Sequence, residues 1–161
     1  MRRNESLATL GPEDEFSGAV GELLLKFPFL VAMFLLVLND YVIKPSGNMS
    51  LLAGKLSNIA GLFAMPILLY VGLRVFLKGS CVKQLSLLST TLVGVVFVLW
   101  ESSAWFHNLY SVVLRSLLEF LPYTVLYHPT QDVSDLLCLP SLLCAHRFLL
   151  YYQREGRIAK K

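Results

Sequence analysis

The sequence predicts an all-α, polytopic membrane protein: a bundle of about four transmembrane helices plus one interfacial helix. Its 161 residues are 55% hydrophobic and only 16% charged, whereas a soluble globular domain has roughly 25% charged residues. The apolar residues gather in long runs, each close to the roughly 20 residues that cross the hydrocarbon of a bilayer. The basic residues fall mainly on one of the two sides that four crossings would create.

The first apolar run extends from Leu23 to Ile43. Lys26 and Pro28 lie near its start, where a lysine can extend to the headgroups and a proline loses little hydrogen bonding. No small-residue cleavage site follows the run, so we expect it to remain as a membrane helix and not to be removed as a signal peptide.

The next runs extend from Leu56 to Leu77 and from about Leu85 to Trp100. The first of these contains Ala60, Gly61 and Ala64, small residues that let helix backbones approach closely in lipid. We therefore expect this helix to be central to the bundle.

The last run extends from about Val133 to Tyr152, with tyrosines at interfacial depth at its end. Before it, residues from Leu109 to Leu121 alternate apolar and polar side chains at helical spacing, which predicts a helix lying in the membrane interface. The predicted division is a flexible cytoplasmic tail over 1–21, a four-helix transmembrane domain over 22–152 and a basic cytoplasmic tail over 153–161.

Charge predicts the orientation. Four crossings would place ten basic residues with the two termini and only three on the opposite side, with Arg147 inside the last run. The positive-inside rule then predicts a multi-pass protein of the cell (inner) membrane with both termini in the cytoplasm. The ten are Arg2, Arg3, Lys26, Arg74, Lys78, Lys83, Arg154, Arg157, Lys160 and Lys161, and the three are Lys44, Lys55 and Arg115.

The net charge of +3 is small and its basic residues are scattered, so we expect no nucleic-acid partner. The bilayer itself is the expected partner, together with a membrane protein or a second copy of the chain. Cys81, Cys138 and Cys144 form no CxxC pair and are expected to be small, buried and unreactive.

With this topology, polar residues that are far apart in sequence fall at one depth, the outward boundary. This candidate binding cluster consists of Asn39, Asp40, Lys44, Lys55, Ser57, Asn58, Asp132 and Asp135. Ionisable groups at membrane depth pair with one another or serve a function, and Asp40 is expected to pair with Lys44 or Lys55. Two explanations stay open, because Asp132 and Asp135 could equally cap the start of the last helix.

Catalytic, cofactor and metal assignments stay open. Carboxylates and an imidazole suit divalent cations, and Asp40, Glu101, His107, Asp132 and Asp135 could supply them, but their spacing matches no metal or nucleophile motif. His107 and His128 are expected in loops.

Two segments of the sequence, LNDYVIKP (38–45) running into LLAGKLSNIAGLFAMP (51–66), and HPTQDVSDLLCLP (128–140), resemble an uncharacterised family of small bacterial four-helix membrane proteins. That family has an LND-H-x-x-K stretch, a GKLSD-x-AGLF stretch and a later D-P-T-D-L-x-x-L-P stretch. The resemblance implies a multi-pass membrane protein with no established activity. The sequence departs from the family at Tyr41, Asn58 and the pair Val133–Ser134. The matching positions are Asn39, Asp40, Lys44, Gly54, Lys55, Ser57, Asp132, Asp135 and Pro140.

Three functions remain in competition. The first is a membrane protein whose polar cluster fixes helix packing and binds a partner or lipid headgroup. The second is an extracytoplasmic enzyme acting on a lipid-linked substrate, with a carboxylate as acid, base or metal ligand and Lys55 holding phosphate. The third is a small ion- or proton-coupled transporter, which is less favoured because the middle of each apolar run contains few polar residues.

Overall fold

The computed structural model describes residues 21–43, 50–77, 81–118 and 132–158, and within these ranges the chain is helical with no strand. The all-α prediction is therefore confirmed for this part of the chain. The elements are α2 (Phe27–Leu38), the π-helix η1 (Asn39–Ile43), α3 (Ser50–Phe76), α4 (Val82–Ser102), α5 (Ala104–Leu118), the 3-10 helix η3 (Val133–Cys138) and α6 (Pro140–Ile158).

Three helical segments are long and apolar enough to cross a membrane: Ala53–Phe76, Val82–Ser102 and Val133–Tyr152. The third matches the predicted run, although it begins as a 3-10 helix. A further apolar helix, Phe27–Ile43, is shorter. Helix α3 starts at Ser50, six residues before the predicted run, so Lys55 and Asn58 lie within its first turns.

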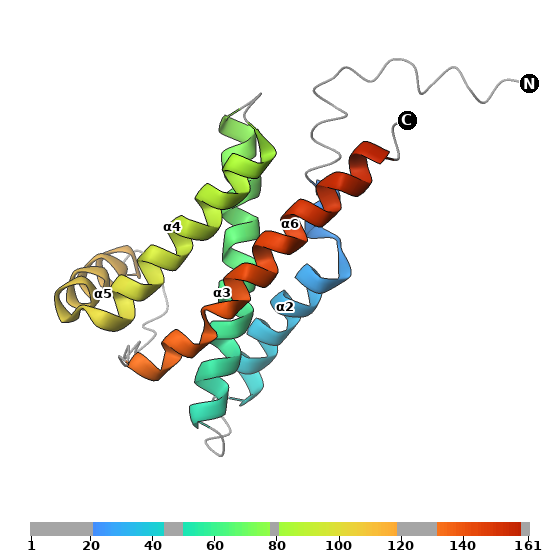
Figure 1. The fold of residues 1–161 in the computed structure, drawn as a ribbon. Helices are drawn as coiled ribbons and strands as arrows, with labels where there is room; N and C mark the ends of the chain where they lie inside the picture. The colour runs from blue at the N-terminus through green and yellow to red at the C-terminus, as the bar shows by residue number, and fades with distance from the viewer. Residues whose placement is uncertain (1–20, 44–49, 78–80, 119–131, 159–161) are drawn as a thin grey trace, which may run out of the picture.

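The helices α2, α3, α4 and α6 run alternately up and down, and the long α3 lies among the other three (Figure 1). It contacts all of them, which confirms the central place predicted from its small residues. Ala53, Ala60 and Ala64 on α3 are almost completely buried. Side chains of this size let helix backbones approach closely where lipid supplies no hydrophobic driving force.

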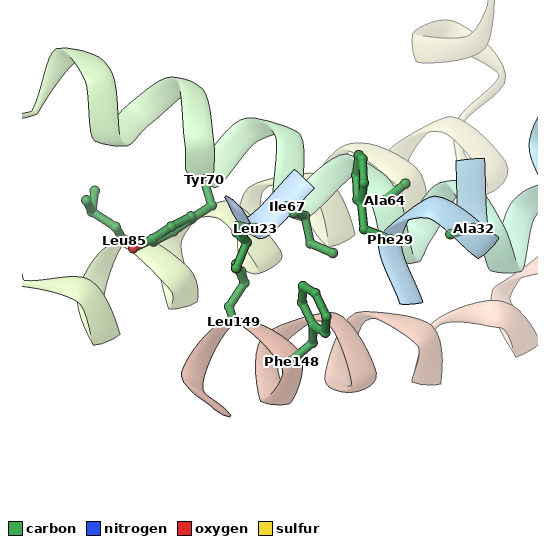
Figure 2. Close-up of a cluster of buried hydrophobic side chains, with 9 residues drawn as sticks. All are labelled: Leu23, Phe29, Ala32, Ala64, Ile67, Tyr70, Leu85, Phe148 and Leu149. Atoms are coloured by element: carbon green, nitrogen blue, oxygen red, sulfur yellow. The ribbon is translucent and has the colours of Figure 1, made fainter. Parts of the chain in front are cut away.

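The core lies where α2, α3 and α6 meet, with Leu85 of α4 at one end (Figure 2). Ile67 of α3 and Leu149 of α6 have no exposed surface. The ring of Phe148 packs edge-on against Phe63 at a centroid distance of 5.5 Å. Dispersion contacts of this kind hold helices together in lipid.

The sequence predicted one continuous helix for the first apolar run. In the structure the helix is interrupted just before Phe27. Lys26 is extended (φ −72°, ψ 139°) and Pro28 occupies the first turn of α2. A proline in a continuous helix would clash with the preceding turn and leave a carbonyl unpaired. The break places the Lys26 ammonium 5.1 Å from the ring centroid of Tyr152 at the end of the last apolar run.

Helix α5 begins five residues earlier than predicted, and Ser103 alone separates it from α4. Ser103 is extended and ends α4, and its hydroxyl accepts the Phe106 N–H at 3.3 Å, which caps α5. His107 is therefore in a helix, and the prediction that it lies in a loop is wrong. The predicted end of this helix at Leu121 and the position of His128 lie outside the described residues.

Two of the three cysteines are exposed, which corrects the prediction that all are buried. Cys138 is buried against α3, whereas Cys144 is on the outer face of α6 and Cys81 precedes α4. The prediction used the tendency of cysteine to be buried in soluble proteins, which does not have to hold for helices apolar enough to cross a membrane. Helix α6 continues to Ile158, which places 153–158 of the predicted tail in the helix.

Candidate functional site

Four polar side chains join α3 to η3. We call Lys55, Asn58, Ser134 and Asp135 the α3–η3 cluster. Lys55 and Asn58 are three residues apart on α3 and therefore share one face of the helix. The Lys55 ammonium donates to Ser134 Oγ at 2.6 Å and to Asp135 Oδ1 at 3.3 Å. Asn58 Nδ2 donates to the second oxygen of Asp135 at 2.6 Å.

Burial makes this contact more than a surface ion pair. The side chains of Lys55 and Asp135 are 32% and 12% exposed, so one end of the pair is shielded and the other meets the surroundings. Both oxygens of Asp135 are hydrogen-bonded, which offsets the cost of burying a carboxylate. Lys55 is paired with Asp135 at 3.3 Å, so it is not the isolated phosphate-binding cation that the sequence suggested.

Asp132 caps η3, as expected from the explanation that the acidic residues cap the start of the last helix. Its Oδ1 accepts the Ser134 N–H at 2.9 Å, and its backbone oxygen accepts the Asp135 N–H at 2.9 Å. Hydrogen bonds from Ser134 hold the pKa of Asp132 below its usual value. The Ser134 side chain contributes most, and its backbone N–H contributes next. Asp135 does not act as a simple second cap, because its side chain bonds α3.

A second contact joins η3 to α4. Glu101, in the last turn of α4, is only 3% exposed, and its Oε2 accepts the Asp132 N–H at 3.0 Å. The start of η3 is thus fixed on one side by Lys55 and Asn58 of α3 and on the other by Glu101 of α4. These contacts explain why a short 3-10 helix is ordered at the entrance to α6.

Asn39 forms a third contact between elements at the same end of the bundle, joining η1 to α3. Its side chain is completely buried, and Nδ2 donates to the backbone oxygen of Ala53 on α3 at 2.8 Å. Asn39 also begins the π-helix η1, an irregular geometry that is frequent at functional sites. Its Oδ1 is buried and accepts no hydrogen bond from the described residues.

The structure brings together part of the predicted cluster. Lys55, Asn58 and Asp135 bond one another, Asp132 is next to them through Ser134, and Asn39 bonds backbone two residues before Lys55. These contacts occur at the ends where α2 stops and where α3 and η3 begin, all in the lower half of the view in Figure 1.

The contacts described above do not include the other predicted members. Asp40 is exposed on η1, and the ion pair of Lys55 is with Asp135, so the alternative pairing of Asp40 with Lys44 stays a prediction. Ser57 is half-buried and makes no side-chain hydrogen bond within the described part of the chain. Lys44 lies outside the described residues. Between residues 21 and 158, the described ranges hold no group of three His, Cys, Asp or Glu side chains that could bind a metal ion.

Two contacts in the structure were not predicted from the sequence. Ser134 was noted only as a departure from a motif, yet its hydroxyl lies between Lys55 and Asp132. Ser86 Oγ of α4 lies 2.9 Å from His146 Nδ1 of α6, within two membrane-length segments. The repeated four-residue spacing of Ser86, Thr90 and Gly94 was the available signal, because small residues at that spacing mark a face on which another helix packs.

No protein-family model, curated protein or solved structure matches the chain. The resemblance to a family of small membrane proteins therefore rests on the quoted motifs and stays a prediction.

Proposed function

We propose that the chain is a multi-pass membrane protein that crosses the bilayer four times, with both termini in the cytoplasm. The fourth crossing is the helix Phe27–Ile43, whose length of about 25 Å approaches the 30 Å of a typical hydrocarbon core. The unequal distribution of basic residues supports this orientation. It would place the α3–η3 cluster at the outward boundary.

In this orientation, we propose that the exposed edge of the cluster binds a lipid headgroup. We call Lys55, Asp132 and Ser134 the rim. The supporting observation is that η3 is held on two sides, by hydrogen bonds to α3 and to α4, while Ser134 remains exposed and Lys55 and Asp132 half-exposed. A rigid set of polar groups with partial exposure at headgroup depth suits recognition of a polar ligand.

The test is native mass spectrometry of the protein extracted in mild detergent. Asp132→Asn and Ser134→Ala should each reduce the amount of retained phospholipid by up to about tenfold, which corresponds to about 1.4 kcal/mol. Lys83→Gln is the matched control, because Lys83 is an exposed charge at the opposite end of α4. Equal retention in all three variants would contradict headgroup binding at the rim.

A second candidate is an enzyme that acts on a lipid-linked substrate. The observation in its favour is the 2.6 Å contact of Ser134 Oγ with Lys55 Nζ, since a serine beside a lysine base can act as a nucleophile. Against it, the same nitrogen already donates to Asp135 Oδ1 at 3.3 Å, so the lysine is engaged in an ion pair. Covalent labelling of Ser134 by a fluorophosphonate probe, lost in Lys55→Gln, would favour this candidate over headgroup binding alone.

A further inference from the structure

A groove of about 480 Å³ runs along the side of the bundle between α4 and α6. Leu87, Val95 and Leu99 line it from α4, and Leu139, Leu143 and His146 line it from the α6 side. Its volume is within the range of about 300–1,000 Å³ that is typical of small-ligand sites. The lining is apolar except near its inner end, where His146 already contacts Ser86 and Thr90 bonds the backbone oxygens of its own helix.

The length of the groove matches that of one lipid acyl chain in one leaflet. From Leu87 to Leu99 it follows α4 for about 18 Å, and one leaflet of a 30 Å hydrocarbon core is about 15 Å deep. Both walls belong to segments that are long and apolar enough to cross a membrane. Leu87, Val95, Leu99 and Leu143 are all exposed, so the groove opens sideways toward the surroundings of the bundle.

A second copy of the chain fits this groove less well than a lipid chain does. Helices that pack against each other in membranes use small residues for close backbone approach. Three small residues line the groove: Thr90 is buried, Thr91 is exposed, and Gly94 is covered by Leu142 of α6, since a Cβ built on Gly94 would lie 2.9 Å from Leu142 Cδ1. The remaining space is a slot between exposed side chains, not a backbone contact surface.

The headgroup end of the groove is acidic. The groove ends at Leu99 and Leu139, beside the contact of Glu101 with the start of η3. Asp132 is half-exposed there, and its carboxylate accepts hydrogen bonds from the uncharged groups of Ser134. The ammonium of Lys55 is 3.3 Å from Asp135. A primary ammonium could bond Asp132 directly, whereas a headgroup without a cation would lack that contact.

From this geometry, and resting on the proposed headgroup function, we propose that the groove and Asp132 form one binding site for an amine-bearing phospholipid. One acyl chain lies between α4 and α6, and the headgroup ammonium pairs with the Asp132 carboxylate.

The test uses the full chain in nanodiscs that contain phosphatidylethanolamine with a diazirine on one acyl chain. After irradiation and proteolysis, cross-links should concentrate on groove residues of α4 and α6. Thr91→Trp fills the groove from an exposed position and should lower the cross-linking there by about tenfold. Leu92→Trp is the matched control, because Leu92 is also exposed at the same depth but lies outside the groove.

The headgroup is tested by repeating the experiment with a diazirine-bearing phosphatidylglycerol. The ethanolamine lipid should cross-link about tenfold more strongly, and Asp132→Asn should remove that preference. Groove cross-linking without a headgroup preference would overturn the amine site, whereas the headgroup proposal is decided separately by the phospholipid retained in Asp132→Asn and Ser134→Ala. A preference that depends on Asp132 without enrichment in the groove would overturn only the chain site. A dimer that Thr91→Trp dissociates would make a second copy the occupant and overturn the proposal.

Discussion

At the scale of single residues, the ion pair of Lys55 and Asp135 has a specific energetic signature. Each charge compensates the other, and Asn58 donates a hydrogen bond to the second oxygen of Asp135. Removing one member leaves the other charge partly buried, whereas removing both leaves no charge to compensate. The stability of the pair should therefore depend on the two residues jointly.

A double-mutant cycle tests this. Lys55→Met and Asp135→Leu should each lower the free energy of unfolding by about 1–3 kcal/mol, and the double variant should lose clearly less than the sum of the two. The measurement is SDS titration in mixed micelles, with Lys83→Met as the control for loss of an exposed lysine. Strictly additive losses would show that the pair has no coupling.

Asp132 should make the stability depend on pH in one direction. Its folded pKa is lower than the value of about 3.9 in an unfolded chain, because hydrogen bonds from Ser134 favour the carboxylate. The stabilisation is thus complete above about pH 4 and is lost as the pH falls through the folded pKa.

The observable is the difference in melting temperature between the wild-type protein and Asp132→Asn in detergent, since the other carboxylates titrate in both. The difference should be constant near neutral pH and should close below about pH 4. A difference that grows on acidification would mean that the carboxylate is not stabilised in the folded protein.

At the scale of helices, the contact of Ser86 with His146 is a hydrogen bond between two membrane-length segments. Such bonds contribute about 0.6 kcal/mol on average and up to about 1.7 kcal/mol. Ser86→Ala should destabilise the protein by an amount in this range, as measured by SDS titration. Ser102→Ala is the control, because Ser102 bonds only the Val98 oxygen of its own helix. Equal losses in the two variants would assign no interhelical role to Ser86.

Gly94 controls how closely α4 and α6 pack. Gly94→Ala should be nearly neutral, because the added methyl meets only the flexible end of Leu142 and alanine favours the helix. Gly94→Leu should cost about 1–3 kcal/mol, because the larger side chain cannot fit without moving α6. The same unfolding measurement checks both, and a neutral Gly94→Leu would show that the two helices separate easily.

The sequence predicted helices well where an apolar run is uninterrupted. The bounds Val133–Tyr152 coincide with the observed segment, and Val82–Ser102 differs from its prediction by a few residues. The errors occurred where a single residue governs the backbone: the break at Lys26, the cap at Ser103 and the 3-10 start at Asp132. Hydrophobic periodicity indicates which face of a helix is apolar, but it does not predict the backbone geometry at single residues.

The candidate site was half predictable for a related reason. Topology placed Lys55, Asn58 and Asp135 at one depth, and the structure adds that they face one another. The predicted topology could not distinguish these three residues from Asp40, which it places at the same depth but which is exposed on η1. Depth follows from position along each helix, whereas the direction of a side chain depends on how the helices rotate against their neighbours, which is a property of packing.

At the scale of the whole molecule, the proposed topology can be tested with the natural cysteines. Cys81 precedes α4 and is exposed, so it should lie on the cytoplasmic side. In a Cys138→Ser/Cys144→Ser background, a membrane-impermeant maleimide should label Cys81 only after the cells are permeabilised. Adding Ser134→Cys in place of Cys81 should give labelling in intact cells. The reverse pattern would invert the proposed orientation.

In the proposed four-crossing topology, the unequal helix lengths would also affect the bilayer around the protein. The segment Phe27–Ile43 reaches about 25 Å, whereas Ala53–Phe76 beside it reaches about 36 Å if straight. To fit the same 30 Å core, the longer helix must tilt or the membrane must thicken beside it, and near the shorter helix the membrane must thin. The protein should thus deform its bilayer unevenly around its circumference, and membrane thickness should influence where it accumulates.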